Sequence, residues 1–194
     1  TVKEFEHAGV SGIHLEDQVW PKRCGHMLGK TLIPKEEMCQ KLKAAQDARE
    51  DPDFVLIARC DAMLVNGLDD VLERCDAYVE AGADMLFCEV RDSMDEVKAV
   101  ADHFKGRVPL HWNHSPSPMV PRMSAKEVEA LGFKTCCFYV QSLMAAAKTM
   151  QEVLAEIRKS GTSEGIADRM IGFDELWEIN DMASIREMEK KYAT

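Results

Sequence analysis

Short apolar runs alternate along this chain with longer segments whose apolar residues recur at helical spacing. Five of these runs are short, continuous and rich in apolar residues, as strands of a parallel sheet are when both faces are buried. They cover residues 12–15, 54–58, 85–90, 108–112 and 135–140. Gly9, Gly82 and Gly132 precede three of the runs, where a glycine is expected to end a helix and lead into a strand.

The intervening segments predict helices. They cover residues 34–49, 68–81, 94–104, 124–131 and 142–160, followed by a last helical region over 172–192. Ser124 and Glu127 have the spacing of a capping box at the start of one helix. Strands that alternate with helices at intervals of roughly 30 residues indicate βαβ units and a parallel sheet.

Polar residues follow the ends of at least four consecutive predicted strands. They are Glu16, Asp17, Arg59, Asp61, Glu89 and Asn113. A (β/α)₈ barrel collects its chemistry at the carboxyl ends of many strands, whereas a doubly wound sheet does so at one switch point. The pattern therefore favours a barrel. Because such a barrel needs about 250 residues, we expect an incomplete one, with about five of eight strands present and the first three missing.

Composition narrows the range of partners. The chain has 194 residues, enough for one domain, and a net charge of −10, which argues against a nucleic-acid partner. No apolar run approaches the roughly 20 residues that span a membrane.

No signal peptide and no initiator Met open the chain, so we expect it to begin inside a longer protein. Seven irregularly spaced cysteines favour a reducing compartment, either the cytoplasm or a mitochondrial or peroxisomal matrix.

Residues 21–30 carry the densest chemistry in the chain. Cys24 lies among Lys22, Arg23 and His26, and positive neighbours favour the reactive thiolate. The segment also holds two glycines, which allow a loop to fold over a ligand. The plain alternative is an ordinary loop cysteine.

Residues 22–26, Lys-Arg-Cys-Gly-His, with Gly29 and Lys30, resemble the signature of the isocitrate lyase/phosphoenolpyruvate mutase superfamily, in its lyase branch. Three further segments, 14–18, 57–62 and 81–89, match in order and spacing, and the tail from residue 174 resembles that of methylisocitrate lyases. The resemblance implies an N-terminally truncated barrel. Residues 1–160 would be its C-terminal part, and 161–194 a helical segment that packs on, or swaps with, another subunit.

The resemblance also implies residue roles. Cys24 would be the acid/base that delivers a proton to a carbanion-like product, with His26 beside it. The implied substrate contacts are Arg23, Arg59, Glu89, Asn113, Ser115 and Ser117. Glu16, through water, and Asp17 would lie near a bound Mg²⁺ (or Mn²⁺), while the main aspartate ligands belong to a segment that this sequence lacks.

Each of these residues has a structural alternative as well. Arg59 would pair with Asp61 or Glu89, because a buried arginine is costly without a partner. Glu16 would be a capping or salt-bridged acid. Residues 113–117 would form a polar turn around Pro116, which is a common arrangement.

The function that the resemblance implies is cleavage of a carbon–carbon bond. A 2-hydroxy di- or tricarboxylate of the isocitrate, methylisocitrate or dimethylmalate type would give a 2-oxo acid and a second carboxylic acid. Three alternatives stay open: an oxaloacetate hydrolase or decarboxylase, a phosphonopyruvate-type enzyme, and an inactive truncated paralogue that serves as a structural partner. The expected partners are a small carboxylate substrate and further copies of the chain, as a dimer or tetramer, without nucleic acid or membrane.

Overall fold

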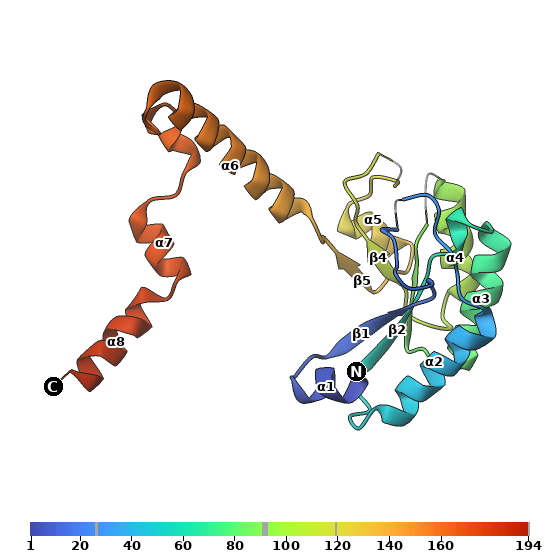
Figure 1. Cartoon of the computed structure of the whole chain (residues 1–194). Coiled ribbons are helices and arrows are strands. Elements are labelled where there is room, and N and C mark those ends of the chain that lie inside the picture. The colour runs from blue at the N-terminus through green and yellow to red at the C-terminus, as the bar shows by residue number, and fades with distance from the viewer. Residues whose placement is uncertain (26, 91–92, 119, 194) are drawn as a thin grey trace. The chain divides into compact units, whose positions relative to one another are not determined.

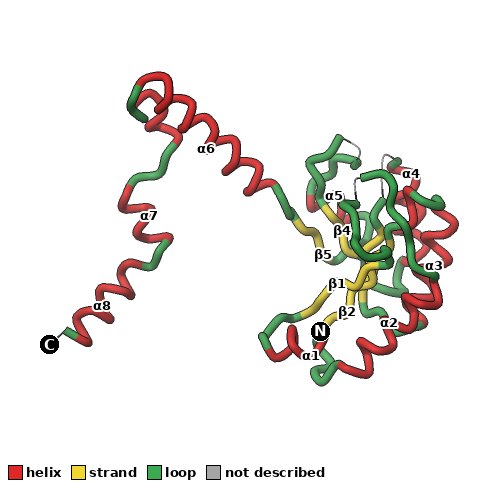
Figure 2. Tube along the Cα trace, in the orientation of Figure 1, coloured by secondary structure: helices red, strands yellow, loops and turns green. Residues whose placement is uncertain are grey.

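The chain folds into two units. A computed structural model describes residues 1–25, 27–90, 93–118 and 120–193, and its contacts separate Thr1–Val140 from Gln141–Thr194. The five strands all belong to the first unit, as Figure 2 shows in yellow. Helix α6 (Gln141–Ser160) belongs with the second unit, whereas the sequence analysis placed a boundary after residue 160.

The strands of the first unit are parallel and follow one another in chain order. One sheet contains β1 (Gly12–Glu16), β2 (Val55–Cys60) and β3 (Met85–Cys88), and a second contains β4 (His111–Asn113) and β5 (Thr135–Cys137). A parallel bridge between Leu86 and Leu110 joins β3 to the start of β4. Parallel strands in sequence order with helical connections identify an α/β fold, as predicted.

Helices cover one side of these strands (Figure 1). They are α2 (Lys35–Ala48), α3 (Leu68–Glu80), α4 (Met94–Phe104) and the short α5 (Ala125–Ala130); α1 (Val2–His7) precedes β1, and a 3₁₀ turn (Ala62–Leu64) follows β2. The core between the layers includes Leu42, Leu56, Val71, Leu86 and Val100, all fully buried. Burial of such side chains is the main favourable contribution to folding.

Local signals in the sequence are found where they were predicted. Ser124 and Glu127 form the complete capping box of α5. Gly82 and Gly132 have φ of 103° and 99°, a backbone region that glycine adopts at little cost, in the turns before β3 and β5. Strand β4 is shorter and starts later than the predicted 108–112, because the segment begins Val108-Pro109 and proline cannot donate to a ladder.

The second unit consists of helices in the described part of the chain. After α6 come a 3₁₀ segment (Glu164–Arg169), α7 (Phe173–Ile179) and α8 (Met182–Tyr192). The single helical region predicted over 172–192 is two helices, because Asp181 adopts a left-handed φ of 49° between them. No described residue from 141 to 193 is buried, and large apolar side chains such as Leu154, Phe173 and Ile179 are exposed.

None of the helices described here is both long and apolar enough to cross a bilayer. All seven cysteines are free thiols.

Candidate active site

One face of the strands gathers the predicted chemistry. Side chains alternate between the two faces of a strand, and this face carries His14 and Glu16 from β1, Arg59 from β2, Phe87 from β3 and His111 from β4. The intervening side chains pack into the core beneath the helices: Leu56, Ala58, Cys60, Leu86 and Leu110. The carboxyl ends of the strands therefore meet at one edge.

Arg59 is the centre of this edge. Its Nε lies 2.9 Å from Glu16 Oε1 and 2.9 Å from Asp61 Oδ2, and its Nη2 lies 3.0 Å from Glu89 Oε2. The guanidinium also lies 4.6 Å from the centre of the Phe87 ring. Three carboxylates from the ends of three strands thus converge on one cation. Pairing of Arg59 with Asp61 and Glu89 is the structural alternative that the sequence predicted for this arginine.

The acids of this cluster differ in pKa. Burial and a hydrogen bond to Asp61 raise the pKa of Glu16 to about 7. Burial opposes ionisation of Asp61 as well, but the hydrogen bonds from Glu16 and Arg59 outweigh it and hold the pKa of Asp61 well below its usual range. Arg59 stays charged, because its three acidic partners raise its pKa against the effect of burial. Glu16 is therefore the carboxyl group that exchanges a proton near neutral pH.

The cysteine loop is anchored directly to this cluster. Lys30, whose side chain is 1% exposed, donates to Gly25 O at 2.8 Å and to Asp61 Oδ1 at 3.0 Å. Gly25 is buried so closely that a Cβ there would lie 2.5 Å from Arg59 Nη2 and 3.0 Å from Glu89 Cδ. The residue next to Cys24 thus packs on the Arg59–Glu89 pair.

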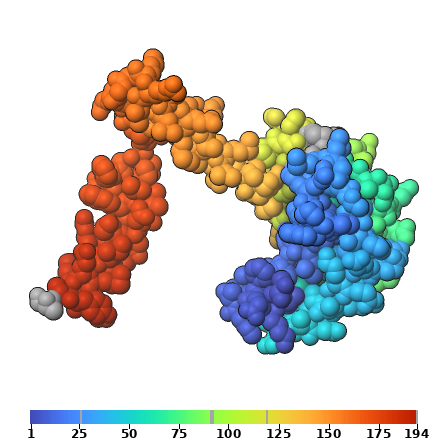
Figure 3. Space-filling model, in the orientation of Figure 1, coloured from blue at the N-terminus to red at the C-terminus, as the bar shows by residue number. Residues whose placement is uncertain are grey.

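Cys24 itself is exposed, on the segment after β1 that lies at the surface of the first unit (Figure 3, in blue). The main chain of the exposed Arg23 is held at both ends by Gln18, whose Oε1 accepts from Arg23 N at 2.8 Å and whose Nε2 donates to Arg23 O at 3.0 Å. Lys22 pairs with Glu16 at 3.3 Å. His26, a predicted catalytic residue, lies outside the described residues.

Asp17 has a different environment from the one predicted. It is fully buried, its Oδ1 accepts from Asp61 N at 2.9 Å, and its Oδ2 accepts from Tyr78 OH at 2.8 Å. Burial raises its pKa. Both oxygens are used to position the chain after β2, so the geometry favours a structural role over the metal contact predicted for Asp17.

Residues 113–117, which begin at the last residue of β4 and are called the segment after β4 below, form the second part of the edge. Asn113 Oδ1 accepts from Cys137 Sγ at 3.2 Å, and the Oγ of the buried Ser115 lies 3.1 Å from Tyr139 OH. Ser117 N donates to Ser115 Oγ at 3.2 Å. Asn113, Ser115 and Ser117, which were predicted to bind a carboxylate, therefore lie close together. Their contacts within the protein are also those of a polar turn, the structural alternative given for these residues.

Aromatic rings connect the two parts. The Phe87 ring centre lies 5.1 Å from that of His111, and the His14 ring lies 5.5 Å from Phe87 and 5.2 Å from His111. Burial, with His14 and Arg59 adding to it, lowers the pKa of His111 to about 4. The imidazole is therefore neutral at neutral pH, with one nitrogen that donates and one that accepts.

Several residues of the site were missed or assigned a lesser part by sequence reasoning. Asp61 and Lys30 join the loop to the strands, and His111 and Cys137 lie on the site face. The last two have a sequence signal, since each occupies a strand position that alternates with, or lies opposite, Asn113. The contact of Lys30 with the strands has no comparable signal, because its carboxylate partner Asp61 is distant in sequence.

The described residues offer only part of a metal site. Among them, no group of three or more His, Cys, Asp or Glu side chains is arranged to hold a metal ion. Glu16 is suited to the outer part of a Mg²⁺ shell, because it is an oxygen donor at a strand end and Mg²⁺ keeps several waters. It does not form a complete ligand set by itself.

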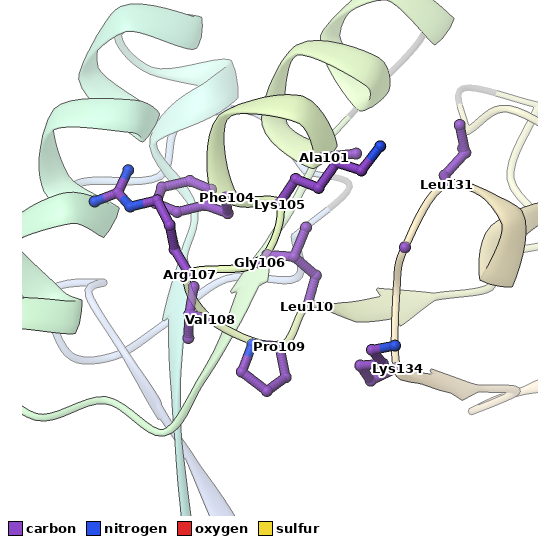
Figure 4. Close-up of a pocket in the computed structure, with 11 residues that line it drawn as sticks. Ala101, Phe104, Lys105, Gly106, Arg107, Val108, Pro109, Leu110, Leu131 and Lys134 are labelled. Carbon is purple, nitrogen blue, oxygen red and sulfur yellow. The ribbon is translucent and has the colours of Figure 1, made fainter.

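A separate cavity of about 390 Å³ lies away from this edge (Figure 4). Its lining includes Phe104, Arg107, Pro109, Leu131 and Lys134, which precede β4 and β5. It therefore lies at the amino ends of the strands and contains none of the predicted site residues.

Comparisons with known proteins show what this chain is similar to. Residues 1–158 match the sequence profile of a family described as phosphoenolpyruvate phosphomutase. The whole chain is 40% identical to 2,3-dimethylmalate lyase of Eubacterium barkeri, covering 66% of that protein. It is 38% identical to 2-methylisocitrate lyase of Escherichia coli (strain K12), over 92% of this chain and 60% of that protein. The chain thus spans less than two thirds of these relatives.

Solved structures of similar fold include two further activities. Oxaloacetate acetylhydrolase in complex with 3,3-difluorooxalacetate has a TM-score of 0.89 at 30% identity, over 98% of this chain and 64% of that one. Phosphonopyruvate hydrolase in complex with oxalate and Mg²⁺ has a TM-score of 0.86 at 30% identity, over 100% of this chain and 67% of that one.

Proposed function

Because this chain belongs to the phosphoenolpyruvate phosphomutase family, we propose that the complete protein is a carbon–carbon lyase acting on a 2-hydroxy di- or tricarboxylate. The observation that carries the proposal is the packing of Gly25 on Arg59 and Glu89. It brings the Cys24 loop to a cation suited to bind carboxylates. The lyases among the relatives support the reaction class.

We further propose that the complete protein closes a (β/α)₈ barrel. The five parallel strands in chain order support this, together with the length of the relatives beyond the part matched here. Three additional βα units before Thr1 would pair with the free edges of β1 and β5. They would also supply the remaining ligands of a metal site at the carboxyl ends of the strands.

The proposed cofactor is Mg²⁺, with Mn²⁺ as a substitute. When bound, it would polarise the oxygens of the 2-oxo acid portion of the substrate and so stabilise the charge of that portion. Glu16 would hold the ion through water. The phosphonopyruvate hydrolase complex with oxalate and Mg²⁺ supports this proposal from a protein of similar fold.

In the proposed reaction Arg59 binds the carboxylate of the 2-oxo acid portion. Its Nε and Nη2 donate to the surrounding acids, and we propose that Nη1 donates to a substrate oxygen. A base removes the proton of the 2-hydroxyl group, its electron pair forms the new C=O bond, and the neighbouring C–C bond breaks. The electron pair of that bond moves to the departing acid, which becomes an enolate-like dianion.

The segment after β4 would stabilise this developing charge. Asn113, Ser115 and Ser117 would donate hydrogen bonds to the carboxylate of the departing acid, and preorganised donors of this kind are a large source of rate acceleration. The Cys24 thiol would then transfer its proton to the carbanion carbon, with His26 beside it. The exposed Arg23 would attract the anionic substrate, and Gly25 and Gly29 would allow the loop to close over it.

Assays of the complete protein with Mg²⁺ would test the proposal. Isocitrate should yield glyoxylate and succinate, methylisocitrate pyruvate and succinate, and dimethylmalate pyruvate and propionate; the proposal expects turnover of at least one. Release of oxalate and acetate from oxaloacetate, or of phosphate from phosphonopyruvate, would instead identify the activity of a structural neighbour. Absence of turnover in every assay would favour an inactive paralogue that serves as a structural partner.

We also propose that the helices from residue 141 onward pack against another copy of the chain in a dimer or tetramer. Their exposed apolar side chains, such as Leu154 and Trp177, support this. Light scattering of the complete protein should give a multiple of the monomer mass, and a monomer would contradict the proposal.

A further inference from the structure

Strand β5 contacts the segment after β4 at alternate positions. Cys137 donates to Asn113 Oδ1 at 3.2 Å, and two residues further on Tyr139 OH lies 3.1 Å from Ser115 Oγ. Between these pairs, His114 N donates to Cys137 O at 2.9 Å and continues the ladder beyond the last residue of β4. Two alternate side chains, Cys137 at the end of β5 and Tyr139 beyond it, thus contact two alternate side chains at and after the end of β4.

A second observation extends this contact beneath Asn113. His111 Nε2 lies 3.3 Å from Cys137 Sγ, and His111 Nδ1 lies 2.7 Å from Thr135 Oγ1. Because the Cys137 thiol hydrogen is directed to Asn113, Nε2 must donate to the sulfur and Nδ1 must accept from the Thr135 hydroxyl. That hydroxyl has one hydrogen, and His111 is nearer than its other neighbour, Met85 Sδ at 3.4 Å.

The result is a directional series of hydrogen bonds in which each group donates to the next. It runs from Thr135 through the neutral His111 and Cys137 to the carbonyl oxygen of Asn113. A primary amide has its oxygen and nitrogen on opposite sides. Binding the oxygen of Asn113 to the sulfur therefore fixes the orientation of its NH₂ group.

We propose that Cys137, supported by His111, is a positioning residue that orients the Asn113 amide toward the carboxylate of the departing acid, while Tyr139 does the same for Ser115. The inference rests on the proposed function of the segment after β4. Cys137 acts through Asn113 and is not itself a proton donor to substrate. Burial raises the pKa of its thiol, so it stays protonated and keeps the hydrogen that the contact requires.

The pair Cys137→Ala and Cys137→Ser, made in the complete protein, tests this proposal. Alanine removes the donor, whereas serine keeps an O–H in its place. Cys136→Ala is the matched control, because Cys136 is the neighbouring thiol and packs against the core instead. The readouts are KM and kcat with the acid that is cleaved, and binding of three product-like probes. Propionate and succinate represent the departing acid, and oxalate represents the 2-oxo acid end.

The loss of one hydrogen bond to a positioned group predicts a three- to tenfold effect, on the order of 1 kcal/mol. Cys137→Ala should weaken propionate and succinate binding and raise KM by about that factor, with oxalate binding unchanged. Cys137→Ser should restore most of the loss, and Cys136→Ala should resemble the unaltered protein. Equal weakening by the two alanine variants, or no change in Cys137→Ala, would overturn the inference.

Asn113→Ala separates this inference from the function on which it rests. If Asn113→Ala weakens succinate and propionate binding but Cys137→Ala does not, Cys137 does not position the amide, and the proposed function stands. If the unaltered protein binds neither oxalate nor these acids, the proposed function fails, and this inference fails with it.

Discussion

The two parts of the candidate site differ in the kind of interaction that holds them together. Around Arg59 three carboxylates surround a guanidinium at 2.9 to 3.0 Å, and Lys30 adds a second buried cation. Around Asn113 the partners are a thiol, a neutral imidazole and hydroxyl groups. One part is a cluster of full charges, and the other is a series of neutral dipoles.

This difference matches the charges that each end of the proposed substrate carries. The 2-oxo acid end is anionic before and after cleavage, so fixed cations bind it throughout. The departing acid also carries a carboxylate, but its additional negative charge develops only as the bond breaks, and neutral preorganised donors stabilise that added charge more in the transition state than in the ground state. We therefore propose that the Arg59 cluster binds the 2-oxo acid end, and that the Asn113 segment binds the carboxylate of the departing acid and stabilises the further charge that develops on it.

The largest effect is expected at Arg59. Arg59→Met in the complete protein should lower kcat/KM by about 10³-fold or more, because it removes the cation proposed to bind the substrate and the cation that pairs with Glu89 and Asp61. The same change should lower the free energy of unfolding by about 3 to 5 kcal/mol. Enzyme assays and urea unfolding measure the two quantities.

Arg107→Met is the matched control for this prediction. Arg107 pairs with Asp76 at the protein surface, and exposed pairs contribute at most about 1 kcal/mol. If both arginine variants lose the same amount of stability and activity, the Arg59 cluster has no special role. The contrast between this charged cluster and the neutral Asn113 segment would then have no functional meaning.

An intermediate effect is expected at Gly25, where the loop meets the charged cluster. In Gly25→Ala the added Cβ would lie 2.5 Å from Arg59 Nη2, and the ion pair with Glu89 restricts how far the guanidinium can move. We expect about 1 to 3 kcal/mol of destabilisation and roughly tenfold lower kcat/KM. Gly172→Ala, where a Cβ meets nothing within 4 Å, should leave both quantities unchanged. Full activity in Gly25→Ala would show that the loop does not depend on this contact.

The smallest effect concerns the proton on Glu16, which faces Arg59, Lys22, Asp61 and Gln18. Because its pKa is about 7, Glu16 is protonated at lower pH and must lose that proton before its carboxylate can accept a hydrogen bond from a Mg²⁺-bound water, as proposed. Calorimetric titration should therefore show about tenfold tighter Mg²⁺ binding at about pH 8 than at about pH 6. Glu16→Gln should remove this pH dependence, and an unchanged slope in that variant would contradict the assignment.

The raised pKa of Glu16 also determines how the stability of the metal-free protein changes with pH. Because folding raises the pKa of Glu16 from its usual 4.5 to about 7, its protonated form favours the folded state. This contribution is complete below about pH 4.5 and is lost as the pH rises through about 7. Thermal unfolding of the metal-free protein should show a smaller decrease over that range in Glu16→Gln.

Much of the first unit could be predicted from local pattern. Short continuous apolar runs and helical spacing locate the strands and helices to within a few residues, and the Ser124 capping box and the glycine turns follow from backbone chemistry alone. The helices from residue 141 were also found, but the break at Asp181 was not. A left-handed aspartate has no strong sequence signature, because most aspartates adopt ordinary conformations.

The site likewise contains residues that local pattern could predict and residues that it could not. Strand-end polarity correctly brings Glu16, Arg59 and Glu89 to one edge, because parallel strands all end there. The contacts of Lys30 and Asp17 could not be assigned from the sequence pattern. Lys30 donates to Gly25 and Asp61, and Asp17 accepts from Asp61 and Tyr78, and these contacts are fixed only in the folded protein. Side-chain partners over long sequence separation are the information that local spacing does not contain.

The measurement that tests the account most directly compares the unaltered complete protein with Cys24→Ser and the control Cys136→Ser. The account predicts that Cys24→Ser loses at least about 100-fold in kcat, the contribution of a positioned acid, while its oxalate binding stays unchanged. Cys136→Ser should keep full activity. Undiminished turnover in Cys24→Ser would contradict the assignment of this thiol as the proton donor.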